Sequence, residues 1–147
     1  MEIRFAKQGE EVQIMTLIRE LAAYENALDE VVNTPEKLAK DLFDEEYCEA
    51  LVAVLDGEII GFALFYTSYS TWRGPCIYLE DLYVKDQYRR FKAGSRLFES
   101  IVQIAKDRGY KRMDWQVLEW NEPAIKFYEH KKATLDAAWL NGRLFLE

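Results

Sequence analysis

The sequence predicts a single layered domain of the α/β (α+β) class, in which helices pack on a mixed sheet. Segments with strand character precede and alternate with segments of helical periodicity along the chain. The chain has 147 residues, of which 50% are hydrophobic, and this suffices for one ordinary domain with a sizeable core. No repeat, linker or low-complexity stretch interrupts the sequence, so we expect one domain from residue 1 to residue 147.

The N-terminal half is expected to contain two helices and a hairpin. Residues 10–24 carry apolar side chains at helical spacing. Thr34 followed by Pro35 is typical of a helix start, with Thr34 as the N-cap. The pair Asp56 and Gly57 predicts the turn of a β-hairpin. Strands are expected at residues 3–6, 51–55, 58–66 and 77–84.

The C-terminal half is expected to contain two more helices. Residues 94–108 form one apolar stripe, and Gly109 is placed to end that helix. Asn121 as N-cap and Pro123 in the first turn predict a helix that runs to His130. Two further strands are expected at residues 112–118 and 143–146.

Charge and cysteine content exclude several classes of function. The net charge of -7 argues against nucleic acid and anionic membranes as main partners and suits a cationic substrate, although an acidic surface also serves solubility alone. Cys48 and Cys76 have neither metal-ligand nor disulfide spacing, so no metal is expected. The longest apolar run, residues 59–66, is too short to span a bilayer, and the first residues resemble no secretory segment. We therefore expect a cytoplasmic protein.

The most informative part of the chain is a strand that leads through a basic turn into a helix. Glu80 and Asp81 lie within the apolar strand at residues 78–84. The turn that follows, at residues 88–92, is rich in arginine and lysine, and a small residue, a glycine and a serine come directly after it. Backbone N–H groups at such a helix N-terminus can hold an anionic pyrophosphate. A second junction between strand and helix, at residues 119–128, carries a tyrosine one to two turns into its helix.

These segments together resemble the GNAT superfamily of acetyl-CoA-dependent N-acetyltransferases, and the order of the expected elements matches its fold over essentially the whole chain. Within the superfamily they are most similar to the diamine and spermidine/spermine branch. The resemblance implies a mixed, mostly antiparallel central sheet with a splayed central strand pair, flanked by about four helices. It also implies acetyl-CoA as co-substrate, a small-molecule amine as acceptor, and a homodimer.

The basic turn matches the coenzyme A motif of this superfamily with one departure. Arg89 occupies its first position and Gly94 its last, while Lys92 replaces the middle glycine. Lys92 either strains the turn or offers an ammonium to the phosphates. Taken alone, the turn could also be a solvated basic loop. The resemblance implies that coenzyme A contacts Arg89, Arg90, Lys92, Ala93, Gly94 and Ser95.

Four more residues are assigned to the cofactor by resemblance. The N–H groups near Leu82 and Val84 would meet the thioester carbonyl and the pantetheine arm at the splayed strand. Asn121 either contacts coenzyme A or only caps its helix. Tyr128 matches the general acid, because a phenol stays protonated at neutral pH and can protonate the departing thiolate. The alternative for Tyr128 is a core position, although Phe127 is expected to face the core and Tyr128 the cleft.

A set of carboxylates and aromatic residues is assigned to the amine. Glu80 matches the carboxylate of the central strand, where it acts as a base through a water molecule or only binds the ammonium. In a regular strand Asp81 would point to the opposite face. A cationic amine is well held by carboxylates and an aromatic face. The resemblance places Tyr24, Glu25, Trp72, Glu80 and Asp81 around the amine.

Two features leave the acceptor open. Ser70 stands where animal polyamine enzymes have aspartate, which indicates a shorter or less charged amine, and Trp139 could lie in the core, the pocket or a dimer interface. Other readings are acetylation of a protein N-terminus or lysine, and a coenzyme A-binding regulatory module that has lost catalysis. Retention of both Glu80 and Tyr128 argues against the last of these.

Overall fold

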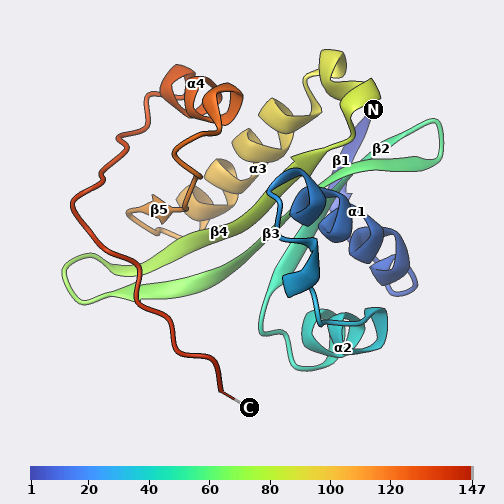
Figure 1. Ribbon diagram of the computed structural model, residues 1–147, viewed down its shortest axis with the longest axis horizontal. Coiled ribbons are helices and arrows are strands. Elements are labelled where there is room, and N and C mark those ends of the chain that lie inside the picture. The colour runs from blue at the N-terminus through green and yellow to red at the C-terminus, as the bar shows by residue number, and fades with distance from the viewer. Residues whose placement is uncertain (147) are drawn as a thin grey trace. The chain divides into compact units, whose positions relative to one another are not determined.

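The structure is a computed structural model that describes residues 1–146. The chain divides into two compact units, residues 1–116 and a unit that begins at Val117. The first unit contains a five-stranded sheet in the order β1-β2-β3-β4-β5, antiparallel throughout except for the parallel pair β4 and β5 (Figure 1). The mixed, mostly antiparallel sheet that the sequence predicts is therefore confirmed. Its strands are β1 (Glu2–Phe5), β2 (Glu49–Leu55), β3 (Glu58–Ser70), β4 (Gly74–Val84) and β5 (Met113–Asp114).

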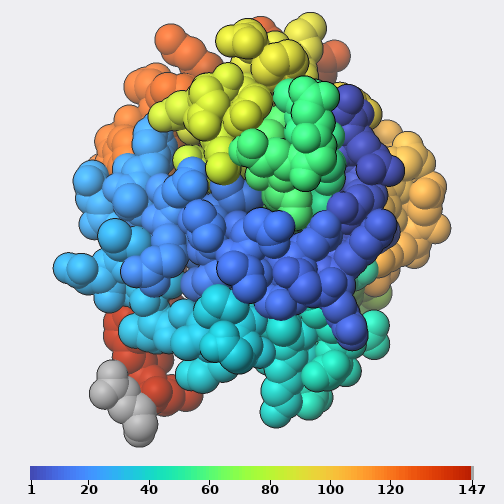
Figure 2. All heavy atoms as spheres, turned by 90° about the vertical axis from the view of Figure 1, so that its right-hand side faces the viewer, coloured from blue at the N-terminus to red at the C-terminus, as the bar shows by residue number. Residues whose placement is uncertain are grey.

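Helices cover both faces of this sheet. On one face α1 (Glu11–Tyr24) and α2 (Pro35–Ala39) share an apolar cluster with the strands, and α3 (Ala93–Asp107) lies behind the sheet in Figure 1. The second unit contains α4 (Glu122–His130). Figure 2 shows α1 and α2 in blue and cyan below the β2–β3 turn. Among residues 1–146, no helix is long and apolar enough to cross a membrane. The short helical segments are η1 (Leu28–Glu30), η2 (Lys40–Asp44) and η3 (Asp86–Phe91).

Local signals in the sequence place several element boundaries. The hydroxyl of Thr34 accepts the N–H of Lys37 at 3.2 Å and caps α2. Asp56 and Gly57 both have positive φ, at 50° and 78°, and form the tight turn between β2 and β3. Gly109, with φ of 75°, closes α3. Each of these predicted boundaries is confirmed.

Three predicted elements differ from the structure. The strand expected at residues 112–118 pairs with β4 only over Met113–Asp114, because β4 and β5 separate beyond that point. The strand expected at residues 58–66 is longer in the structure, where β3 continues to Ser70. The strand expected at residues 143–146 is wrong, since those residues carry neither helix nor strand. A strand needs a paired edge, and the apolar pattern alone does not supply one.

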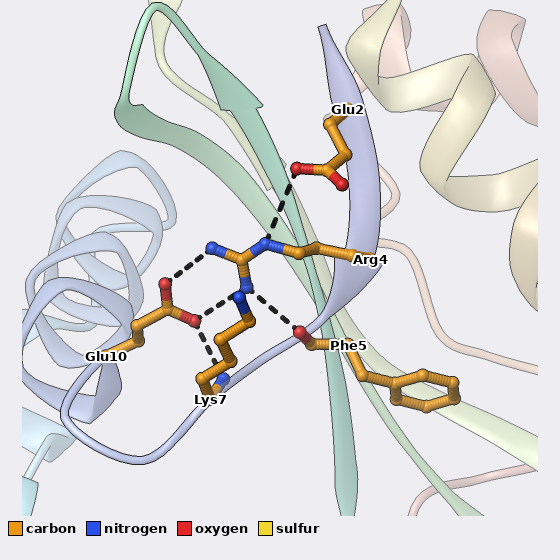
Figure 3. A network of polar contacts seen from close by, with 5 residues as sticks. All are labelled: Glu2, Arg4, Phe5, Lys7 and Glu10. Atoms are coloured by element: carbon orange, nitrogen blue, oxygen red, sulfur yellow. Dashed lines mark hydrogen bonds and ion pairs between the residues drawn. The ribbon is translucent and has the colours of Figure 1, made fainter.

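A network of polar contacts joins β1 to the start of α1 (Figure 3). The guanidinium of Arg4 donates two hydrogen bonds to the carboxylate of Glu10, at 2.9 and 2.7 Å, and a third to the Phe5 carbonyl. The backbone N–H of Lys7 donates to the same carboxylate at 2.7 Å. The hydrogen bonds from Arg4 hold the pKa of Glu10 below its usual value. Glu10, the residue before α1, thereby fixes how the helix leaves the sheet.

We expect Glu10→Gln to reduce the free energy of unfolding at neutral pH by about 1 kcal/mol, because it weakens a bidentate ion pair. Since the folded-state pKa of Glu10 is lowered, this contribution is present above the unfolded-state pKa and is lost as the pH falls through the folded-state value. Urea unfolding at several pH values measures it. An equal loss of stability at neutral and strongly acidic pH would contradict the assignment.

Candidate active site

The central strand β4 contains one extra residue at Glu80. Its register with β3 shifts there by one position. The backbone hydrogen bonds show the same shift. The N–H of Ile77 donates to the carbonyl of Arg112 on the β5 side, whereas the N–H of Lys85 donates to the carbonyl of Ile60 on the β3 side. In a regular strand residues 77 and 85 would direct their N–H groups to the same side. Glu80 therefore marks a β-bulge that reverses the alternation within β4.

The bulge directs two backbone N–H groups toward an open edge. Because the N–H of Lys85 points to β3, those of Val84 and Leu82 point to the opposite side, where β5 lies. Among the described residues, however, no strand pairs with that edge of β4 beyond Tyr78. This is the splayed strand pair that the resemblance predicts. Leu82 and Val84 thus have the orientation that their predicted roles toward the thioester and the pantetheine arm require.

The same bulge turns Asp81 toward helix α1. Asp81 shares a face of β4 with Tyr83, whose hydroxyl donates to Glu20 of α1 at 3.1 Å. Opposite Asp81 on β3 lies Leu64, which belongs to the apolar cluster shared with α1. The strand is therefore not regular at this point, and Glu80 and Asp81 do not point to opposite faces as they would in a regular strand. A bulge lets two consecutive side chains approach the same side.

Three carboxylates from two elements gather on this face. Glu25 is the C-cap of α1, while Glu80 and Asp81 lie on β4. Burial raises the pKa of Asp81 to about 7, with further contributions from Glu80 and Glu25. Burial, followed by the charge of Glu80, also raises the pKa of Glu25. Glu80 itself is exposed. Mutual repulsion of this kind is relieved when a cation binds among the carboxylates.

Tyrosines line the same face. The rings of Tyr66 and Tyr78 lie 5.3 Å apart between centroids, and burial together with the charge of Glu80 raises the pKa of both. Tyr24, next to Glu25 in α1, is partly exposed. The resemblance places Tyr24 near the amine, whereas no motif in the sequence indicates Tyr66 or Tyr78. Their only signal was the pairing of β3 with β4, which brings them opposite each other.

Trp72 is not brought to this cluster within the chain. It lies in the turn between β3 and β4 and is 83% exposed. Glu80 follows the start of β4 by six residues, which corresponds to roughly 20 Å along a strand. The hydroxyl of Ser70 accepts the N–H groups of Trp72 and Arg73 at 3.2 and 3.1 Å, so Ser70 shapes the turn. Within one chain Trp72 thus lies in an exposed turn away from the bulge, and its contact with the amine stays a prediction.

The backbone of the basic turn adopts, at Lys92, a conformation that glycine favours. Lys92, between η3 and α3, has φ of 60° and ψ of 27°, which is the left-handed region. Its carbonyl accepts the N–H of Arg96 at 3.1 Å and begins the helix. The N–H groups of Ala93 and Gly94 in the first turn have no partner within an α-helix and can face an anion. Ser95 follows them in the same turn.

Arg89 links this turn to the carboxylate face. It forms an ion pair with Asp86 at 3.1 Å and donates to the Val84 carbonyl at 3.3 Å. Its guanidinium also lies 5.8 and 6.0 Å from the ring centroids of Tyr24 and Tyr83. Arg89 therefore has several defined contacts, although its side chain is 46% exposed.

Arg90 is placed differently, because its guanidinium lies 4.8 Å from the ring centroid of the adjacent Phe91. This local stacking leaves the arginine on the outside of the turn, where the predicted contact with coenzyme A stays a prediction.

The second unit carries the remaining predicted site residues. The side-chain oxygen of Asn121 accepts the N–H of Ala124 at 3.3 Å, so its capping role is confirmed. Tyr128 lies two turns into α4 and is 8% exposed. Its ring meets that of Phe127 edge to face at 5.3 Å. Tyr128 is the more buried of the two, contrary to the expectation that Phe127 would face the core.

Comparisons with known proteins agree with this geometry. The sequence profile of the acetyltransferase (GNAT) family matches residues 15–132. Thialysine N-epsilon-acetyltransferase of Caenorhabditis elegans is 36% identical over 135 residues, which cover 90% of this chain and 84% of the relative. The Bos taurus protein of the same name is 41% identical over 136 residues, covering 86% and 80%. Spermidine/spermine N(1)-acetyltransferase-like protein 1 of Homo sapiens is 34% identical over 90% of this chain, but this match covers only 20% of the relative.

Solved structures show the same fold at low sequence identity. An aminoglycoside acetyltransferase from an uncultured soil metagenomic sample has a TM-score of 0.81 and 22% identity, with 99% of this chain and 96% of that one covered. A ribosomal-protein-alanine N-acetyltransferase from Brucella melitensis has a TM-score of 0.76 and 22% identity, with 98% and 100% covered. The names of these two enzymes give different acceptors, so the fold alone does not identify the acceptor of this protein.

The profile covers most of the chain, and several relatives exceed 30% identity over most of both lengths, so the chain belongs to the GNAT family of acetyltransferases. It is an N-acetyltransferase, and acetyl-CoA is the co-substrate of its family.

We expect Lys92→Gly to raise the free energy of unfolding by about 0.5 kcal/mol. The left-handed conformation costs a residue with a Cβ roughly 1 kcal/mol, and the greater freedom of glycine in the unfolded chain offsets part of the gain. Acetyl-CoA binding should be retained. Urea unfolding and calorimetric titration at two salt concentrations measure the two effects. A sharp loss of affinity with a weaker salt dependence would show instead that the ammonium of Lys92 binds phosphate.

Lys132→Gly is the matched control. Lys132 follows α4 and also has positive φ, at 64°, where its N–H donates to Glu129 in the closing turn of the helix. We expect a similar gain in stability without any change in acetyl-CoA affinity. A stability gain for one lysine and a loss for the other would contradict the shared backbone explanation.

Proposed function

We propose that this protein transfers the acetyl group of acetyl-CoA to a primary amine of a small cationic acceptor, such as a diamine, a polyamine or a lysine-like amine. The observation that carries the proposal is the gathering of Glu25, Glu80 and Asp81 beside tyrosines, on the strand whose other edge is open. Carboxylates with an aromatic face recognise alkylammonium groups. Among the described residues, no group of three or more acidic, histidine or cysteine side chains is arranged to hold a metal ion.

The names of the relatives support a small amine. The relatives at 34 to 41% identity that match at least 86% of this chain are named for thialysine or for spermidine and spermine, which are small amines. Two that match 58% of it are named for tyramine, which is also a small amine. The protein acetyltransferase, by contrast, is similar at 22% identity. A protein or peptide acceptor and a catalytically weak regulatory module are therefore not favoured.

The chemistry needs three contributions from the chain. The thioester of acetyl-CoA supplies an electrophilic carbonyl. We propose that the N–H of Leu82, which points to the open edge of β4, stabilises negative charge on that carbonyl oxygen; such a donor contributes on the order of 3 kcal/mol. The carboxylates hold the acceptor and take up the proton that the ammonium must lose before its nitrogen can attack. Tyr128 is proposed to protonate the departing thiolate.

A panel of amines tests the acceptor class. We expect primary diamines and lysine-like amines to react in preference to neutral or acidic acceptors, with release of the coenzyme A thiol as the measurement. Because a charge-assisted contact contributes about 1.5–3 kcal/mol, Glu25→Gln should lower kcat/KM for diamines about ten- to a hundredfold, and for monoamines less. Glu45→Gln, an exposed carboxylate at the end of η2, is the control. A panel in which only neutral acceptors react would refute the proposal.

Tyr128→Phe removes only the hydroxyl. If Tyr128 is the general acid, turnover should fall about a hundredfold or more while acetyl-CoA affinity changes little. Steady-state kinetics and calorimetric titration measure the two quantities. Tyr47→Phe, at an exposed tyrosine of the first unit, controls for loss of a hydroxyl. Unchanged turnover in Tyr128→Phe would return this residue to a packing role.

We also propose that the protein is a homodimer. Support comes from residues 139–146, an irregular segment with several exposed large apolar side chains, among them Trp139 and Leu140, the latter 96% exposed. Apolar side chains of this kind commonly become buried at an interface between protein chains. We expect light scattering to give twice the chain mass at micromolar concentration. A monomer mass at high protein concentration would exclude the dimer.

A further inference from the structure

We propose that Asp81, rather than Glu80, accepts the proton that the acceptor ammonium must lose, and that Glu80 holds the ammonium and passes the proton on to water. This inference rests on the proposed function, because it assigns steps of amine acetylation to two neighbouring residues. Sequence similarity favours Glu80 for the first step. The geometry of the bulge favours Asp81.

The bulge gives these two carboxylates different surroundings. Asp81 shares the α1 face with Tyr83, lies opposite Leu64 of the apolar cluster and is partly buried. Glu80 is the extra residue of the bulge and remains exposed to solvent. Glu25, at the end of α1, adds a second negative charge close to Asp81. A carboxylate in such a setting takes up a proton more readily than a solvated one.

Several titratable groups face this region and bear on its proton affinity. Glu80 and Glu25 both raise the pKa of Asp81, to about 7, in addition to the effect of burial. A base is most effective when its pKa lies near the working pH, and two carboxylates in unlike environments divide the roles of base and charged partner. The titratable and charged groups on this face are Glu20, Tyr24 and Glu25 of α1, Tyr66 of β3, Tyr78, Glu80 and Tyr83 of β4, and Arg89 of η3.

The ammonium gives one proton to the Asp81 carboxylate, which becomes a neutral acid, and the resulting amine attacks the thioester carbonyl to form a carbon–nitrogen bond. The carbon–sulfur bond then breaks, and the departing thiolate takes up one proton. The nitrogen loses its second proton in the same stage, so these two transfers cancel in the overall proton count. Asp81 releases its proton to solvent by way of the exposed Glu80. One acetylamide, one coenzyme A thiol and one proton result from each ammonium and acetyl-CoA.

The test is the pH dependence of kcat/KM from about pH 5 to about pH 9, which reports the groups of the free enzyme. We expect the wild type to lose activity below an apparent pKa near 7. In Asp81→Asn the acidic limb of the profile, which is this fall of kcat/KM toward low pH, should vanish, and kcat/KM at neutral pH should fall about a hundredfold. Asp81→Glu should restore part of the acidic limb and part of the activity. Glu80→Gln should keep the limb but move it to lower pH, because a neighbouring negative charge is lost. A limb that persists in Asp81→Asn and vanishes in Glu80→Gln would overturn the proposal.

A second measurement does not depend on turnover. Because the folded-state pKa of Asp81 is raised, its contribution to stability is fully present below the unfolded-state pKa and is lost as the pH rises to about 7. Asp81→Asn should therefore gain melting temperature relative to the wild type at pH 8 but not at pH 4. If this variant fails to fold, the carbon-13 titration of the Asp81 carboxyl in the wild type replaces it. A midpoint below about pH 5 would refute the assignment.

The two hypotheses fail in different ways. A wild-type protein that acetylates no amine at any pH would refute the proposed function, whatever the titration of Asp81. An active wild type whose activity limb does not respond to Asp81→Asn would refute only the inference about the proton acceptor.

Discussion

The site depends on a single extra residue in the central strand. Without the bulge at Glu80, the alternation of β4 would carry through unchanged, and the N–H groups of Leu82 and Val84 would point into the β3 ladder. Asp81 would then lie on the α3 face of the sheet. One inserted residue thus creates both halves of the site, an edge with donors directed outward and a face with adjoining carboxylates. Bulges next to active sites commonly re-aim side chains in this way.

The carboxylate face is held together from α1 and from the basic turn. Asn26 takes a left-handed conformation directly after Glu25, and this conformation ends α1. Glu25 is thereby close enough to Asp81 for its charge to raise the pKa of Asp81. Arg89 then joins the turn to Tyr24 and to the Val84 carbonyl. Like charges are gathered here although they destabilise the empty protein. Such an arrangement is typical of a site whose ligand supplies the missing opposite charge.

Two lysines occupy backbone positions that usually favour glycine. Lys92 precedes α3 and Lys132 follows α4, and both have φ near 60°. A residue with a Cβ persists in the left-handed region when the surrounding structure over-determines it. At Lys92 the following helix begins on its own carbonyl, and at Lys132 the closing turn of α4 takes its N–H. The turn before α3 therefore adopts a backbone conformation that glycine favours, although a lysine stands there.

The sequence by itself determined what short-range chemistry controls. The caps Thr34 and Asn121, the turn at Asp56 and the helix end at Gly109 are set by hydrogen bonds within a few residues, and the motifs around Glu80 and Lys92 identified the family. Only the tertiary structure decided the rest of the site. The side to which Asp81 turns, the meeting of the tyrosines and the exposure of the β3–β4 turn depend on register between strands, as does the early end of β5. The register between β3 and β4 changes at the bulge at Glu80, and the alternation of apolar and polar residues along β4 does not by itself reveal such an extra residue.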